Sequence, residues 1–165
     1  MKDVQTPIFI RLGRRKASEN SYLKNVTIKN ITGTTASHIA SSITGVPGLR
    51  VENVCIQDVN LQLKGGGKLA DTRVDVPEKE DAYPENRMFG VMLPAYGFYI
   101  RHADNIHLKN VTLSTFGNPE ERYAIVADDV TQLSFTDCHL QKPSSGLPIV
   151  HLIDSQDVTM PDSWR

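Results

Sequence analysis

Three pairs of carboxylates are the residues of this chain best suited to acid–base chemistry. They are Asp128 with Asp129, Glu120 with Glu121, and Glu78 with Glu80. Hydrolysis of a glycosidic bond uses one carboxyl to protonate the leaving oxygen and a second to activate water or attack the sugar. Adjacent residues on a strand point to opposite faces, so Asp128 and Asp129 are expected to diverge. The two glutamate pairs fall in an expected turn and a charged loop, where solvation is the default, and the sequence therefore assigns no catalytic residue.

The cysteines and histidines show no metal-binding pattern. Cys55 and Cys138 have no close partner in the sequence, and no CxxC pair occurs. Zinc and thioredoxin-type sites therefore have no support, and we expect packed or surface free thiols. The sequence predicts neither a metal site nor a cofactor.

Length and composition indicate one domain spanning residues 1–165. Hydrophobic residues make up 39% and aromatic residues 7%, so a core would be built mainly from Val, Ile and Leu. A net charge of -1 gives no electrostatic footprint for nucleic acid or an anionic membrane. No run reaches the roughly 18 apolar residues that span a bilayer. The start, MKDVQTPIFIRLGRRK, has no signal-peptide core, so localisation stays undecided.

Two phrases recur along the chain, which indicates a repeat architecture. One places alternating apolar residues around an Asn or Asp: LKNVTIKNI at 23–31, LRVENVCIQDV at 49–59, IHLKNVTLS at 106–114 and LSFTDCHLQ at 133–141. The other reads PIFIRLG at 7–13, GFYIRHA at 97–103, YAIVADD at 123–129 and PIVHLID at 148–154. Within the second phrase, Ile100, Val126 and Leu152 are spaced 26 residues apart.

The alternation in both phrases is that of strands rich in Val, Ile and Thr. Helical solenoids lack support, and a leucine-rich repeat would place its Asn after the strand, not between two strand-like pieces. We therefore predict an all-β parallel β-helix, or solenoid, of about five coils. Residues 64–96 break the period, and we expect one long loop insertion there, with 83–96 ordered against the coil wall.

Asn25, Asn53, Asn110 and Asp137 recur at matching places in the first phrase. Asn and Asp tolerate left-handed backbone conformations and form local hydrogen bonds at bends. Stacked in register, they would turn the chain at one corner of every coil.

The phrases PIFIRLG, YPENRMFG, LPAYGFYIRHADNIHLKNVTL, LKNVTIKNITG and YAIVADDV resemble the C-terminal coils of family 28 glycoside hydrolases, the polygalacturonases and rhamnogalacturonases. The resemblance covers roughly residues 7–141. It implies a right-handed β-helix and, for a complete enzyme, hydrolysis of pectic polysaccharides, typically in the periplasm or outside the cell.

The catalytic motifs of that family do not occur in this sequence. Asn-Thr-Asp and Gly-His-Gly are absent, and Arg11-Leu12 is not the Arg-Ile-Lys motif. Asp128-Asp129 lies in a phrase that matches a later coil of the family, not its catalytic Asp-Asp. Since a PIFIRLG-like strand follows these motifs in the family, the chain is expected to correspond to the supporting coils after them.

Binding residues are predicted on the outer wall. Aligning PIFIR with GFYIR places Ile8 with Phe98 and Ile10 with Ile100 on the inside. Arg11 and Arg101 then point outward in one column, about 10 Å apart if one coil lies between them. With Tyr96, Tyr99 and His102 they are the candidates for binding uronate carboxylates of a pectic polysaccharide or oligosaccharide. The competing interpretation is an Arg on a strand wall that pairs with a loop carboxylate.

Residues 1–13 form the expected open end of the solenoid. An uncovered terminal coil leaves backbone groups and inward apolar residues free to pair with another chain. We therefore expect self-association, or a separate partner chain that carries catalytic coils, at this end.

Three functions stay open at this point: a polygalacturonase-like hydrolase fragment, a non-catalytic carbohydrate-binding β-helix, and a structural partner that completes another chain's solenoid.

Overall fold

The computed structural model describes residues 1–15 and 21–165, and in this part of the chain nine strands form one curled, parallel sheet. The elements are β1 (Phe9–Arg11), β2 (Leu23–Thr34), β3 (Ser41–Thr44), β4 (Val51–Gly65), the 3-10 helix η1 (Leu69–Arg73), β5 (Ala95–Gly117), β6 (Tyr123–Thr136), β7 (His139–Leu140), β8 (Val150–Ile153), β9 (Gln156–Thr159) and the 3-10 helix η2 (Asp162–Trp164). The predicted all-β class is confirmed.

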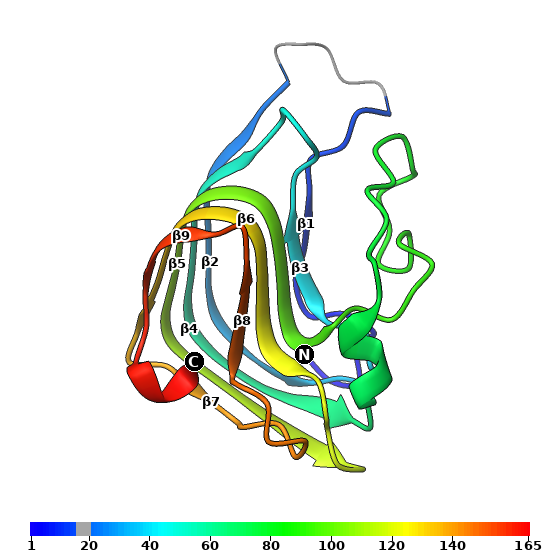
Figure 1. Ribbon diagram of the computed structural model, residues 1–165, viewed down its shortest axis with the longest axis vertical. Helices are drawn as coiled ribbons and strands as arrows, with labels where there is room; N and C mark the ends of the chain where they lie inside the picture. Colours follow the sequence, from blue (N-terminus) through cyan, green and yellow to red (C-terminus); the bar gives the residue numbers. More distant parts are fainter. Residues whose placement is uncertain (16–20) are drawn as a thin grey trace.

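The long strands bend, so the sheet has three limbs (Figure 1). The first limb stacks β1, β3, the start of β5, the start of β6 and β8, which makes five parallel rows in the described chain. The second limb stacks β2, β4, the middle of β5, the end of β6, and β9. The third limb contains the ends of β2, β4 and β5, with β7.

Apolar side chains stack row upon row inside the curl. In the first limb Ile10 pairs with Ile43, which pairs with Ile100. Ile8 and Phe98 are buried in the same core, so the predicted inward set of this limb is confirmed. Residues at equivalent places in successive rows therefore bury the same face, as strand periodicity requires.

One predicted alignment is wrong by one residue. Ile100 pairs with Ala127, which in turn pairs with Leu152, whereas Val126 pairs with Tyr99. A one-residue slip sends a side chain to the opposite face of a sheet. Val126 accordingly packs on the outer side of the first limb instead of in the main core.

The chain turns at residues in the left-handed region, most of which are Asn or Asp. Asn25, Asn53 and Asn105 turn the chain at one corner, and their stacked side chains form a ladder of hydrogen bonds. The side-chain amide of Asn53 donates to Asn25, and that of Asn105 donates to Asn53. Asn110 and Asp137 belong to a second ladder, in which Asn110 donates to Asp58. The expected single corner is therefore two corners, although the left-handed conformation of all four predicted residues is confirmed.

Residues 66–94 connect β4 to β5 and contain η1 but no strand. This segment, the cover loop, lies along the outer side of the first limb (green, right of β3 in Figure 1). Its Val76, Met88, Phe89 and Leu93 are buried there in a second apolar cluster. The expected insertion at 64–96 thus includes four strand residues, and the cover loop is packed against the wall.

The two ends of the stack differ. At the C-terminal end, Trp164 of η2 is buried and meets Phe135 edge-on, with ring centroids 5.4 Å apart. At the other end, β1 pairs only with β3 and β2 only with β4 among the strands described. Val26, Ile28 and Ile31 of β2 are consequently half-buried, although their counterparts Val54, Ile56 and Val59 on β4 are buried.

The corner ladder gives a stability prediction. Asn53→Ala removes two side-chain amide hydrogen bonds and forces a left-handed alanine, so we expect a loss of about 1–2 kcal/mol in the free energy of unfolding. Asn53→Gly keeps the left-handed turn and should lose less. Chemical denaturation measures both variants. Asn60→Ala, an exposed strand position outside the ladders, is the matched control, and an equal loss there would contradict the role of the corner.

Candidate binding site

The predicted arginine column exists in the first limb. Arg11 pairs with Thr44, which pairs with Arg101, which pairs with Asp128. One row therefore separates the two arginines, which is the case that the sequence analysis considered. The cover loop lies over this column and supplies partners to both guanidinium groups, so the column is not the open groove that the sequence suggested.

Arg101 is the most fully engaged residue of the column. Its Nη2 lies 2.5 Å from Glu78 Oε1, and its Nη1 donates to the carbonyl of Val76 at 2.7 Å. Its Nε lies 2.9 Å from Asp128 Oδ2, an ion pair without hydrogen-bond alignment. Arg101 therefore joins the wall to the cover loop through opposite charges on both sides.

Arg11 holds the cover loop by its backbone. Its Nη2 donates to the carbonyls of Glu78 and Lys79, at 2.8 and 3.2 Å, and its Nη1 donates to the carbonyl of Gly45. Burial lowers the pKa of Arg11, Arg101 lowers it further, and Glu78 acts in the opposite direction. The two arginines are thus close enough to interact, and the carboxylate of Glu78 offsets their repulsion.

His102 lies at a left-handed corner, with φ of 48°, directly after Arg101. Its Nδ1 is 2.6 Å from Asp129 Oδ2, and its Nε2 is 3.1 Å from both oxygens of Glu78. Both ring nitrogens of His102 therefore contact carboxylates, one on the wall and one on the cover loop. Only 9% of His102 is exposed, and it bridges the corner to the cover loop.

Asp128 and Asp129 reach different partners. Asp128 accepts from the hydroxyl of Tyr99 and faces Arg101, whereas Asp129 binds His102 and Arg50. They part because Asp129 lies at a left-handed corner, not because of the expected strand alternation. Burial would raise the pKa of Asp129, but the hydrogen bonds from His102 and Arg50 outweigh it and lower that pKa. Both carboxylates are committed to cations.

The two predicted tyrosines lie in different environments. Tyr99 is in the cluster under the cover loop, where burial, the largest cause, and Asp128 raise the pKa of its hydroxyl despite Arg101. Tyr96 packs in the main core, and its hydroxyl donates to the carbonyl of Gln141 at 2.6 Å. The structure therefore brings Arg11, Arg101, Tyr99 and His102 together under one loop but not Tyr96. Whether any of them binds a ligand stays a prediction.

A buried ion pair that the sequence analysis missed anchors the base of the cover loop. Arg122 is 0% exposed and Glu120 3% exposed, and both carboxylate oxygens meet the guanidinium group, at 2.8 and 3.0 Å. Arg122 also donates to the carbonyls of His38, Leu93 and Ala95. The expectation of a solvated Glu120 was wrong. Its carboxylate is buried because it pairs with the guanidinium group of Arg122, two residues later in the chain.

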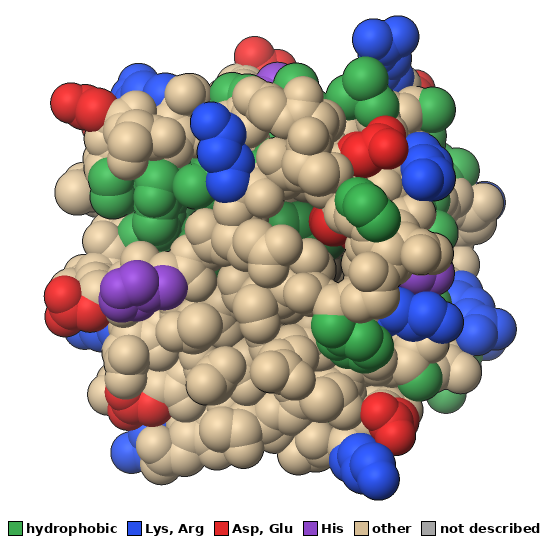
Figure 2. Space-filling model, turned by 90° about the horizontal axis from the view of Figure 1, so that it is seen from below, with side chains coloured by type: hydrophobic (Ala, Val, Ile, Leu, Met, Phe, Trp, Pro, Cys, Tyr) green, Lys and Arg blue, Asp and Glu red, His purple; other side chains and the backbone are tan. Residues whose placement is uncertain are grey.

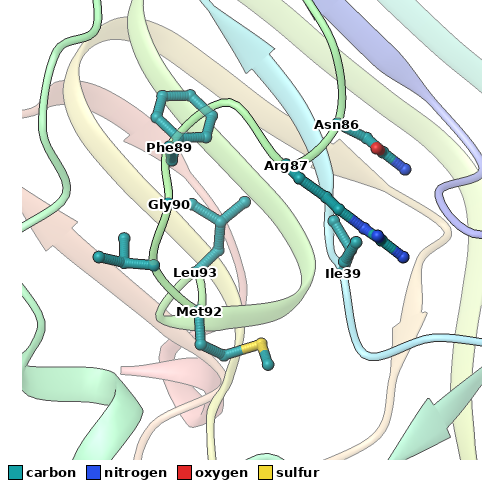
Figure 3. A pocket seen from close by; sticks show the side chains of 8 residues that line it. Ile39, Asn86, Arg87, Phe89, Gly90, Met92 and Leu93 are labelled. Carbon is teal, nitrogen blue, oxygen red and sulfur yellow. The ribbon is translucent and has the colours of Figure 1, made fainter.

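A hollow of about 220 Å³ opens elsewhere on the cover loop (Figure 3). The hollow is lined by Ile39, Asn86, Arg87 and residues 89–93, and Arg87 is the one charged side chain among these residues. Figure 3 shows Arg87 and Asn86 pointing the same way, whereas the Phe89 ring points elsewhere. The hollow brings no acid–base pair together.

Charge does not gather on the face of the molecule that is seen from below in Figure 2. Figure 2 shows acidic and basic side chains scattered around a face that is mostly backbone and uncharged polar groups. Among the described residues, no three His, Cys, Asp or Glu side chains are grouped to hold a metal ion. None of the described helices is long and apolar enough to cross a membrane.

Comparisons with protein-family models, with the curated proteins and with the solved structures find no match for this chain. The resemblance to family 28 glycoside hydrolases therefore rests on the sequence phrases alone.

The Glu120–Arg122 pair gives a pH prediction. Burial would raise the pKa of Glu120, but the hydrogen bonds and charge of Arg122 outweigh it and lower that pKa below its ordinary value of 4.5. A carboxyl with a lowered folded-state pKa stabilises the protein above its unfolded pKa, and the benefit is lost as pH falls through the folded value. Glu120→Gln should therefore cost about 3–5 kcal/mol near neutral pH, and the gap to the wild type should start to narrow as pH falls below about 4.5, by at most about 1.4 kcal/mol per pH unit.

Thermal unfolding followed between about pH 7 and pH 3 measures this gap. Glu80→Gln is the control, because Glu80 pairs with Arg14 at the surface, where ion pairs contribute less than about 1 kcal/mol. A gap for Glu120→Gln that is independent of pH would contradict the electrostatic role.

Proposed function

We propose that the three limbs form a right-handed parallel β-helix of about five coils, and that the chain supplies supporting coils of a polygalacturonase-like hydrolase of pectic polysaccharides. The family phrases of the sequence suggest the pectic substrate. The parallel rows in constant register support the coil architecture.

The observation that carries the supporting role is the open edge of β1 and β2. Among the described strands β1 pairs only with β3 and β2 only with β4, residues 1–4 bond only to the last residues of β2 and to Ala36, and Val26, Ile28 and Ile31 are only half-buried. A further parallel coil would complete both features, because it would pair the edge and bury the same rows. Asn25 offers its amide nitrogen in the same direction, since its oxygen already accepts from Asn53.

Residues 1–13 contribute to this end in two ways. Val4 lies parallel to Thr35, and Met1 and Val4 bond to the end of β2, so the first residues border the third limb. Phe9, Ile10 and Arg11 line a hollow together with Leu23 and Val26 of β2. The proposed occupant is a coil that bears catalytic carboxylates, and a second copy of this chain is the alternative.

The ion pairs made by the carboxylates favour a supporting role over independent catalysis. Asp128, Asp129, Glu120 and Glu78 each face a cation within the described structure. A general acid must exchange its proton with substrate, which a carboxylate held by arginine does poorly. We therefore expect no release of reducing ends when the purified chain is incubated with polygalacturonan or rhamnogalacturonan. Release that disappears on substitution of one Asp or Glu would refute this assignment.

Association through the open end is tested in solution. We expect size-exclusion chromatography with light scattering to show self-association of the chain, since apolar rows remain uncovered. Val26→Asp should return the protein to a monomer, because it places a charge in the proposed contact. Thr159→Asp on β9, at the opposite end, is the control and should leave the assembly intact. A monomer at high concentration would exclude the second-copy occupant.

A further inference from the structure

The charges beneath the cover loop converge on one carboxylate. Glu78 is contacted by Arg101 through Oε1 and by His102 through both oxygens. Arg11 holds the same residue by its backbone carbonyl. Three cationic or proton-donating side chains from the wall thus surround one acidic residue of the loop.

The wall side of this arrangement is set by the strands. Arg101 and His102 are consecutive on β5, and Arg11 lies two rows away on β1, about 10 Å from Arg101 at the usual row spacing. Asp128 and Asp129 hold Arg101 and His102 from the other side. These donors therefore keep their orientation independently of Glu78.

The carboxylate at the centre of these contacts comes from the cover loop and not from a strand. Glu78 lies in the cover loop outside η1, and 28% of its side chain is exposed, so solvent reaches its carboxylate. A guanidinium fork beside an imidazole is a recognised arrangement for binding a carboxylate. A loop residue tethered nearby competes with a free ligand through its high effective concentration.

We propose that Arg11, Arg101 and His102 form a carboxylate-binding cradle, and that Glu78 occupies it as an internal competitor for the uronate carboxylate of a pectic oligosaccharide. The uronate identity rests on the proposed function, whereas the cradle rests on the contacts. Removal of the Glu78 carboxylate leaves Nη2 of Arg101 and Nε2 of His102 without their carboxylate partner on the loop, and an added carboxylate can take its place.

Glu78→Ala tests the cradle by titration calorimetry with trigalacturonic acid. We expect the variant to bind it at least about tenfold more tightly than the wild type, since the competitor is gone. The neutral trisaccharide of galactose should not bind the variant. Arg101→Gln added to Glu78→Ala should abolish the gain. Glu80→Ala, which removes the neighbouring loop carboxylate paired with Arg14, is the matched control and should behave as the wild type.

Circular dichroism and thermal unfolding establish that each variant is folded, and Glu78→Gln replaces Glu78→Ala if the shorter side chain unfolds the chain. Binding of acetate but not of trigalacturonic acid by the variant would support the cradle and refute the pectic ligand. A folded variant that binds neither compound would overturn the proposal and make Glu78 a structural anchor only.

Discussion

The register of stacked parallel rows is the constraint on which the rest of the structure depends. Most rows bend at Asn or Asp residues held in the left-handed region. Hydrogen bonds between the side-chain amides of successive rows keep these bends aligned. Aligned bends keep apolar residues above apolar residues, so the limbs bury a continuous core. The same alignment places Arg11, Thr44 and Arg101 in one outward line, and the chemistry of the wall follows from the geometry of the corners.

The cover loop depends on that line for its position. It is held at its base by the buried Glu120–Arg122 pair, along its length by Phe89 and Val76, and at Glu78 by the cations of the wall. Buried ion pairs are poor sources of net stability but strongly disfavour arrangements that break them. These contacts therefore hold the cover loop in one position on the wall.

Sequence periodicity predicted the features that repeat locally. The alternation of apolar residues identified β1, β2, β4, β5 and β6, and the alignment of two phrases put Arg11 and Arg101 in one column. It did not identify β3, whose SSIT segment has a single large apolar residue. It also misjudged Val126 and Glu120, because their burial is decided by the cover loop and by Arg122. Contacts between distant segments leave no period in the sequence.

The two ends of the described stack are covered by different residues. Trp164 packs edge-on against Phe135 of β6 at the C-terminal end of the stack. A further coil over Phe135 would have to displace this aromatic contact. At β1 and β2 no such contact stands in the way, and the half-buried rows gain apolar burial from any parallel coil that matches their register. The last rows also keep half-buried apolar residues, Leu152 on β8 and Val158 on β9, so both ends of the described stack leave rows that another coil could cover. The proposed partner surface and the arginine column would meet at β1, since Arg11 belongs to this strand and also bonds to the cover loop.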